Sequence, residues 1–145
     1  MPVSENREER REFFRVNFKS PVQFKSYSTD RTGDQVSKRQ SFLHGQSQNI
    51  SQSGILFQME KNPPPISSIL WMNVDLRTLN ICKEIENRAL IFNNGLLGKV
   101  VRVEEDVRNM NTYDVGVCFL TQNDKDSREV QSVLAEVSHE ARISA

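Results

Sequence analysis

Apolar and polar residues alternate along most of the chain, which is the pattern of strands that are buried on one face only. The alternation begins at residue 14, and the polar residues Arg15, Asn17 and Lys19 stand between its first apolar positions. It predicts a first strand whose core-facing residues are Phe14, Val16, Phe18, Val22 and Phe24.

Further strands are predicted at residues 40–50, 54–60, 68–76 and 112–120. In the segment 54–60, Ile55, Phe57 and Met59 share one face, and in 112–120 Val115, Val117 and Phe119 do so. The stretch 28–38 is polar and predicts a loop. The prolines of "KNPPPISS" predict a stiff connector, because proline cannot take part in a central sheet ladder.

Residues 88–105, "RALIFNNGLLGKVVRVEE", predict a hairpin, because an Asn-Gly pair between two apolar runs favours a tight turn. The piece "GLLGKV" within it is not a phosphate loop. Its glycines are too closely spaced, and Val100 stands where a serine or threonine would hold magnesium.

After residue 124 the apolar period changes to that of a helix, predicted over about 124–142 with the stripe Val130, Val133, Leu134, Val137 and Ala141. Many short strands followed by one helix predict a mainly β fold. We expect a six- or seven-stranded antiparallel β-barrel with a C-terminal helix. Residues 1–8 are expected to form a flexible leader, and residues 9–145 a single domain.

Composition excludes several classes of function. The 145 residues are 37% apolar and 26% charged, with 19 basic and 19 acidic side chains, so no global field would attract nucleic acid. No run of apolar residues is long enough to span a membrane, and the N-terminus lacks an apolar signal region.

The histidines and cysteines show no metal-ligand spacing. We expect a cytoplasmic protein with reduced thiols, and Cys118 is read as a small apolar strand residue.

Three arginines stand at the threshold of the first strand, namely Arg10, Arg11 and Arg15. The planar guanidinium fork recognises phosphates and the O6/N7 edge of guanine. Arg11 and Arg15 are four residues apart and therefore share a face in a helix or a strand. Taken alone, the same arginines are better read as solvated surface, with Glu8 or Glu12 as partners.

The turn "NISQSG" at residues 49–54 supplies complementary groups immediately before a strand. The Asn49 amide can bond a base edge, Ser51 can bond a phosphate or ribose oxygen, and Gly54 allows a close backbone approach or a positive φ. The alternative is a simple turn held by its own Asn and Ser side chains. Together with the arginines, the turn forms a coherent purine-nucleotide site.

At these residues the chain resembles a PilZ domain, the bacterial receptor for cyclic di-GMP. The RxxxR motif of that family stands here as "REFFR", residues 11–15, and its [D/N]xSxxG motif as "NISQSG". The later segment "GKVVRVEE…YDVGVCFL" and a following helix are similar too, so the resemblance covers roughly residues 9–140. Asn49 replaces the commoner aspartate.

The resemblance implies a receptor that binds cyclic di-GMP through Arg10, Arg11, Arg15, Asn49, Ser51 and Gly54, without a further cofactor or a metal. It implies no catalysis, since no base, nucleophile or metal site accompanies these residues. The ligand would change the conformation of the chain and so signal to a protein partner. One alternative is a PilZ-like adaptor that binds only protein. Another is a small barrel for single-stranded RNA, which the neutral charge balance disfavours.

Overall fold

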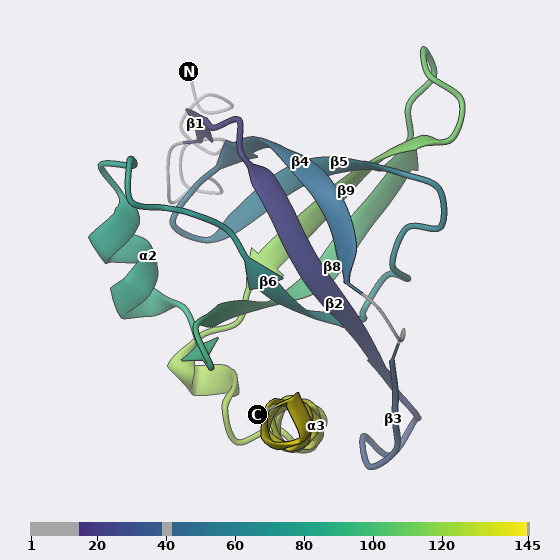
Figure 1. The fold of residues 1–145 in the computed structure, drawn as a ribbon, viewed down its shortest axis with the longest axis vertical. Coiled ribbons are helices and arrows are strands. Elements are labelled where there is room, and N and C mark those ends of the chain that lie inside the picture. Colours follow the sequence, from purple (N-terminus) through teal and green to yellow (C-terminus); the bar gives the residue numbers. More distant parts are fainter. Residues whose placement is uncertain (1–14, 39–41, 145) are drawn as a thin grey trace, which may run out of the picture.

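The structure of the chain is a computed structural model in which residues 15–38 and 42–144 are described. Nine strands form one antiparallel sheet in this part of the chain, and helices lie at its sides (Figure 1). The strands are β1 (Val16–Asn17), β2 (Pro21–Thr29), β3 (Val36–Lys38), β4 (Leu43–Ile50), β5 (Gly54–Glu60), β6 (Ile69–Asn73), β7 (Ile91–Phe92), β8 (Gly95–Glu105) and β9 (Thr112–Phe119).

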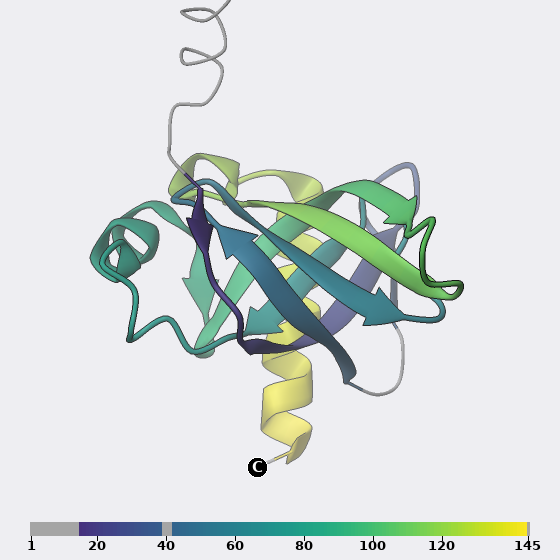
Figure 2. The ribbon, with the colours of Figure 1, turned by 90° about the horizontal axis from the view of Figure 1, so that it is seen from above.

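Six of these strands close into a barrel. The order is β4-β5-β9-β8-β6-β2, and β2 pairs again with β4. Seen from above, the strands wrap around a common interior while α3 (Arg128–Ser144) passes behind them (Figure 2). The predicted antiparallel barrel with a C-terminal helix is therefore confirmed.

The predicted first strand is in fact two strands, β1 and β2, which pair with β4 in registers that differ by one residue. The segment Leu43–Gln46 pairs with β2, whereas Asn49 and Ile50 pair with β1. Residues 18–20 leave the ladder between the two pairings. They place Phe18 in the core, where it is 7% exposed, and leave Val16 38% exposed. The prediction of one continuous strand was wrong here, and Phe14 lies outside the described residues.

Ser47 holds the bend between β1 and β2. Its side chain is fully buried, and its Oγ accepts a hydrogen bond from the backbone N–H of Ser20 at 2.8 Å. The same hydroxyl donates to the carbonyl of Phe18, and the Ser47 N–H donates to the Ser20 carbonyl at 2.9 Å. One buried side chain thus satisfies two backbone groups that the bend removes from the ladder.

Other predicted strands agree with the structure, with some changes at their ends. β5 covers the predicted residues 54–60, with Ile55, Phe57 and Met59 in the core. The strand predicted at 40–50 begins at Leu43, and residues 40 and 41 lie outside the described part. The strand predicted at 68–76 is the shorter β6, and the predicted loop 28–38 contains the end of β2 and all of β3.

The hairpin β7–β8 is confirmed, but its turn is shifted by one residue from the Asn-Gly pair. Asn93 and Asn94 form the turn with φ of 50° and 63°, the positive values that a tight hairpin needs. Gly95 already belongs to β8, where a Cβ atom would collide with the ring of Trp71. No pattern in the sequence predicted α2 (Cys82–Arg88). Cys118 lies on β9, a strand as expected, and is exposed.

Two apolar clusters hold the fold together. One fills the barrel, and the second lies between the barrel and α3. The helix begins at Arg128 instead of near residue 124, because residues 122–124 form a 3₁₀ turn (η1, Gln122–Asp124) capped by Thr121. The predicted helical stripe is confirmed as buried at Val130, Val133, Leu134 and Val137, and the side chain of Ala141 lies outside the described part.

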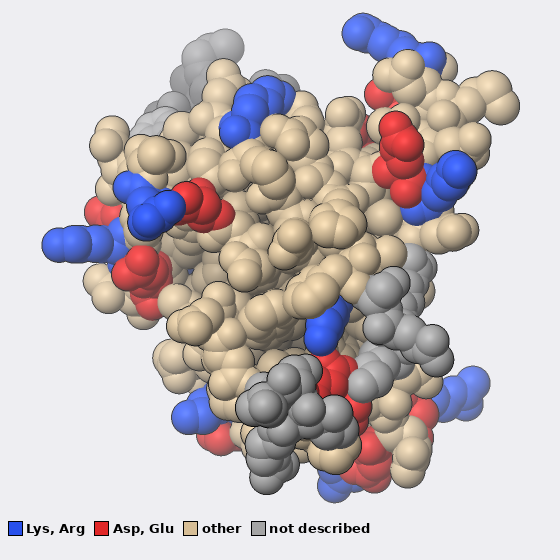
Figure 3. Space-filling view, viewed as in Figure 1, with Lys and Arg blue, Asp and Glu red and all other residues tan. Residues whose placement is uncertain are grey.

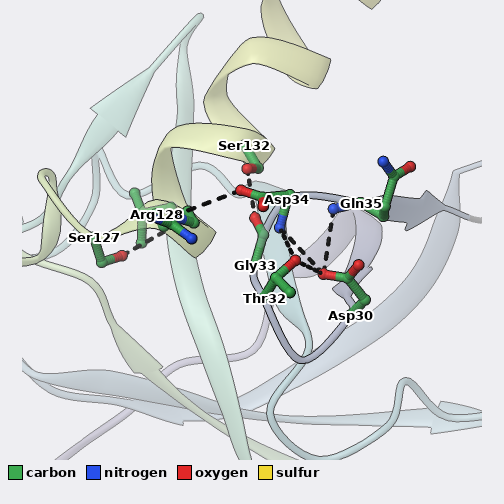
Figure 4. A network of polar contacts seen from close by, with 9 residues as sticks. Asp30, Thr32, Gly33, Asp34, Gln35, Ser127, Arg128 and Ser132 are labelled. Carbon is green, nitrogen blue, oxygen red and sulfur yellow. Dashed lines mark hydrogen bonds and ion pairs between the residues drawn. The ribbon is translucent and has the colours of Figure 1, made fainter.

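Polar contacts tie the beginning of α3 to the β2–β3 loop (Figure 4). Ser132 Oγ donates to the carbonyl of Gly33, and Arg128 Nε lies 3.6 Å from Asp34 Oδ1. Asp30 shapes the loop by accepting hydrogen bonds from the side chain of Thr32 and from two backbone N–H groups. The loop therefore presents its carbonyl to the helix in a fixed geometry.

Glu140 ties the other end of α3 to β2. Its Oε2 accepts hydrogen bonds from Tyr27 Oη at 2.9 Å and from Lys25 Nζ at 3.1 Å. Burial, together with the hydrogen bond to Glu140, raises the pKa of Tyr27 above its usual value, so the phenol stays a donor. The helix is thus fixed to the barrel at both ends.

We expect Ser47→Ala to destabilise the protein by about 1–3 kcal/mol, because it leaves the buried Phe18 carbonyl and Ser20 N–H without their partner. Urea unfolding measures this change. Ser37→Ala, which removes an exposed hydroxyl on the edge strand β3, is the control and should change stability by less than about 0.5 kcal/mol. Equal unfolding midpoints for the two variants would contradict the role of Ser47.

Candidate functional site

The pairing of β1 with β4 brings the two sequence motifs together. Asn17 lies opposite Asn49, and Val16 lies opposite Ile50. The exposed Arg15 precedes this pairing, and its Nη1 donates to Asn49 Oδ1 at 3.5 Å. Residues 34 positions apart in the sequence thus meet at the outer surface of the barrel. Arg10 and Arg11 lie outside the described residues.

The turn between β4 and β5 holds Ser51 inward. Its backbone N–H donates to the Gly54 carbonyl at 2.9 Å, and its Oγ accepts from the Ser53 N–H at 3.2 Å. The residue is only 6% exposed, and its hydroxyl also contacts that of Ser53 at 3.1 Å. In this structure Ser51 therefore shapes the turn, as the simpler reading of the sequence expects, and its ligand contact stays a prediction.

The sequence suggests two reasons for a glycine at position 54, a close backbone approach or a positive φ. The structure agrees with the first of them. A Cβ atom on this residue would collide with the carbonyl oxygen of Val117 on β9. Gly54 pairs with Cys118, and the Ser53 carbonyl accepts from the Phe119 N–H at 2.8 Å. The absent side chain lets the turn lie directly against β9.

A row of residues across four strands continues the site beyond the motifs. Asn49 lies opposite Leu56, Leu56 opposite Gly116, and Gly116 opposite Arg102. The neighbours of Leu56 and Gly116 along their strands are buried, so these two residues face outward. We call Asn49, Leu56, Gly116 and Arg102 the outer row. The sequence analysis did not indicate Leu56, Gly116 or Arg102. The alternation of apolar and polar residues does not reveal which residues of neighbouring strands lie opposite each other.

Positive charge at the site is local. Three exposed basic residues lie near the site: Arg15 just before β1, Lys19 on the bend and Arg102 on β8. Glu104 pairs with Arg102 at 3.7 Å. The face seen in Figure 3 carries charges of both signs around its rim, with few over its centre. Among the described residues of this face, on which β2 and β6 lie in front, the basic side chains are scattered and form no continuous patch.

Comparison with known families decides the classification. The model of the PilZ domain matches residues 9–136. The chain belongs to the PilZ domain family. A comparison with curated proteins finds no match.

Several solved structures are similar to this PilZ domain. Escherichia coli YcgR in complex with c-di-GMP matches with 15% identity and a TM-score of 0.47, over 93% of this chain and 49% of that one. The PilZ domain of Escherichia coli YcgR with c-di-GMP matches with 16% identity and a TM-score of 0.47. This match covers 93% of this chain and 96% of that one. The K. pneumonia MrkH–c-di-GMP complex matches with 12% identity and a TM-score of 0.38, over 93% of this chain and 55% of that one. This chain thus spans about half the length of the full YcgR and MrkH chains.

Neither metal ligands nor a membrane helix are found in the described part of this PilZ domain. Among residues 15–38 and 42–144, no group of three or more His, Cys, Asp or Glu side chains could hold a metal ion. No helix in those ranges is long and apolar enough to cross a membrane. The outer row and the turn 49–54 carry amide, hydroxyl and guanidinium groups that can form hydrogen bonds.

We expect Gly54→Ala to lower the melting temperature, because the added methyl group must push β5 away from the Val117 carbonyl, at about 1–3 kcal/mol. Gly116→Ala is the matched control. Its Cβ would lie 3.5 Å from Arg102 Cβ, an ordinary contact, and alanine suits a strand better than glycine does. Thermal unfolding should therefore separate the two variants, and equal melting temperatures would show that β5 and β9 do not need Gly54.

Proposed function

We propose that this PilZ domain is a receptor for cyclic di-GMP and performs no chemistry on its ligand. The observation that carries the proposal is the contact of Arg15 with Asn49, which joins the RxxxR and NxSxxG motifs at one place on the barrel. Guanidinium forks bind phosphate oxygens and the O6/N7 edge of guanine, and an amide bonds the other guanine edge. Cyclic di-GMP presents all three groups.

Each motif residue has an assigned role in this proposal. Arg11 and Arg15 grip phosphates and guanine Hoogsteen edges, and Arg10 adds a phosphate or stacking contact. Asn49 accepts from a guanine N–H with the oxygen that Arg15 contacts in the structure described here. Their separation of 3.5 Å and the neutral amide make this a weak pairing, so a phosphate readily replaces Asn49 as the partner of Arg15.

Ser51 and Gly54 keep the turn 49–54 in the shape and position that the proposed ligand contacts require. Ser51 keeps the turn in its shape through the hydrogen bonds of its N–H and Oγ, and its hydroxyl reaches the ligand only if it leaves Ser53. Gly54 keeps the turn close to β9. The base and phosphate contacts thus stand on a rigid backbone.

The signal passes, in this proposal, through the residues that precede β1. Residues 1–12 contain few apolar groups and close over the ligand when Arg10 and Arg11 bind it. The barrel stays essentially unchanged, and so does α3, which is fixed at the Gly33 carbonyl and at Tyr27 and Lys25. The ordered segment then forms a new surface for a protein partner.

Arg15→Ala and Arg11→Ala are each expected to weaken cyclic di-GMP binding by about 1–3 kcal/mol, the value of a bidentate arginine contact with guanine. Isothermal titration calorimetry measures this, with GTP and cyclic di-AMP as comparison ligands. Arg108→Ala, an exposed arginine in the β8–β9 loop, is the control and should bind like the unmodified protein. Melting temperatures should not change, because exposed charges contribute little to folding.

Two outcomes of the titration would contradict the proposal. Equal binding by the Arg15 variant and the unmodified protein would remove Arg15 from the site. No binding of any guanine nucleotide by a folded protein would favour the adaptor reading, in which the barrel only holds a protein partner.

Binding should also protect the N-terminal segment from trypsin. Arg7, Arg10 and Arg11 are cleavage sites, and we expect rapid trimming without ligand and clear protection at saturating cyclic di-GMP. The reason is that a closed segment no longer fits the protease. If calorimetry shows binding while trimming proceeds at the same rate, the signal leaves through the barrel surface or through α3 instead.

A further inference from the structure

We propose that Arg102 is a further ligand-binding residue, which holds cyclic di-GMP from the side opposite Arg15 while the ligand lies over Leu56 and Gly116. This inference rests on the proposed function and extends it to the outer row. In this inference, the Arg102 guanidinium donates hydrogen bonds to a phosphate oxygen or to the edge of a guanine of the ligand. No motif in the sequence indicates this residue.

A β-bulge on β8 turns Arg102 outward. Val100 pairs with Val117 and Arg102 pairs with Gly116, so Val101 is an extra residue in the ladder. With strict alternation after the buried Val100, Arg102 would point into the barrel. The extra residue reverses this order, so that Arg102 is exposed and Val103 packs against the core. Bulges that re-aim a side chain are common next to functional sites.

The position of Arg102 matches the size of the proposed ligand site. Three strand spacings separate Asn49 from Arg102, so their Cα atoms are about 14 Å apart. The Arg102 side chain leans back over Gly116, because a Cβ built there would lie 3.9 Å from Arg102 Nε. The side chain therefore leans from β8 toward β9, the strand that lies between Arg102 and Leu56.

The surface between these groups is low and partly apolar. Gly116 has no side chain, and Leu56 is half-buried, so neither stands far above the sheet. A planar base can lie on such a surface while its edges reach side chains at both sides. A guanidinium is also able to stack on an aromatic face, which an ammonium group does less well.

Arg102 is readily released to a ligand. It pairs with Glu104 at 3.7 Å, and the two side chains are 50% and 61% exposed. Such exposed pairs contribute little, and a doubly anionic ligand competes well with one solvated carboxylate. By contrast, Lys99 on the same strand lies 3.6 Å from Glu129 of α3 and so belongs to the helix contact.

The test compares Arg102→Ala, Arg102→Lys and Arg108→Ala in calorimetric titrations with cyclic di-GMP. We expect Arg102→Ala to bind at least about 5-fold more weakly, on the scale of one lost arginine contact. Arg102→Lys should recover only part of the affinity, since it restores the charge but not the fork. Arg108→Ala should bind like the unmodified protein, and all three should keep its melting temperature.

The outcomes separate this inference from the proposed function. If Arg15→Ala weakens binding while Arg102→Ala leaves it unchanged, the proposed function stands and the role of Arg102 is overturned. Full affinity in Arg102→Lys together with a loss in Arg102→Ala would reduce the role to charge alone and overturn the assigned fork contact. An unmodified protein that does not bind cyclic di-GMP overturns both.

Discussion

The pairing of β4 with both β1 and β2 is the constraint on which the barrel and the site depend. Up to Gln46 the strand closes the barrel against β2, and from Asn49 onward it pairs with β1. Ser47 stands at the transition and satisfies the backbone of the bend with its buried hydroxyl. Because β1 and β2 both pair with β4, the strand that closes the barrel also brings Arg15 beside Asn49.

Irregular places in an otherwise regular ladder form the candidate site. A register shift between Ser47 and Asn49 adjoins one end of the outer row, and the bulge at Val101 adjoins the other. Two glycines contribute by lacking a side chain: Gly54 lets β5 approach β9, and Gly116 lowers the surface between the polar groups. The proposed ligand face thus lies on the outer surface of the barrel, which suits a flat ligand bound by arginines.

Much of the fold follows from the sequence alone. The alternation over 54–60 corresponds residue for residue to β5, and the helical stripe of α3 is buried as expected, because period and burial are directly linked. The split of the first strand does not follow, since Phe18 keeps the period although the chain leaves the ladder there. The short α2 was missed because only Ile85 is buried in it, which is too little for a recognisable stripe.

The candidate site was predictable in part. Arg15, Asn49 and Gly54 were found from residue type and spacing, and the β1–β4 pairing explains why the two motifs meet. Arg102 could not be found in this way, because its outward direction depends on the bulge and its neighbours on strand register. The buried position of Ser51 was equally hidden, since a serine in a turn has the same sequence signature whether its hydroxyl faces the solvent or the backbone.

The central claim is that one ligand lies on the outer face of β4, β5, β9 and β8. It is tested most directly by amide NMR spectra of the isotope-labelled protein recorded during titration with cyclic di-GMP. The account predicts the largest shift changes at residues 49–54 and at Leu56, Gly116 and Arg102, with the amides of α3 nearly unchanged. Changes concentrated in α3 and β2, with the outer row unaffected, would contradict it.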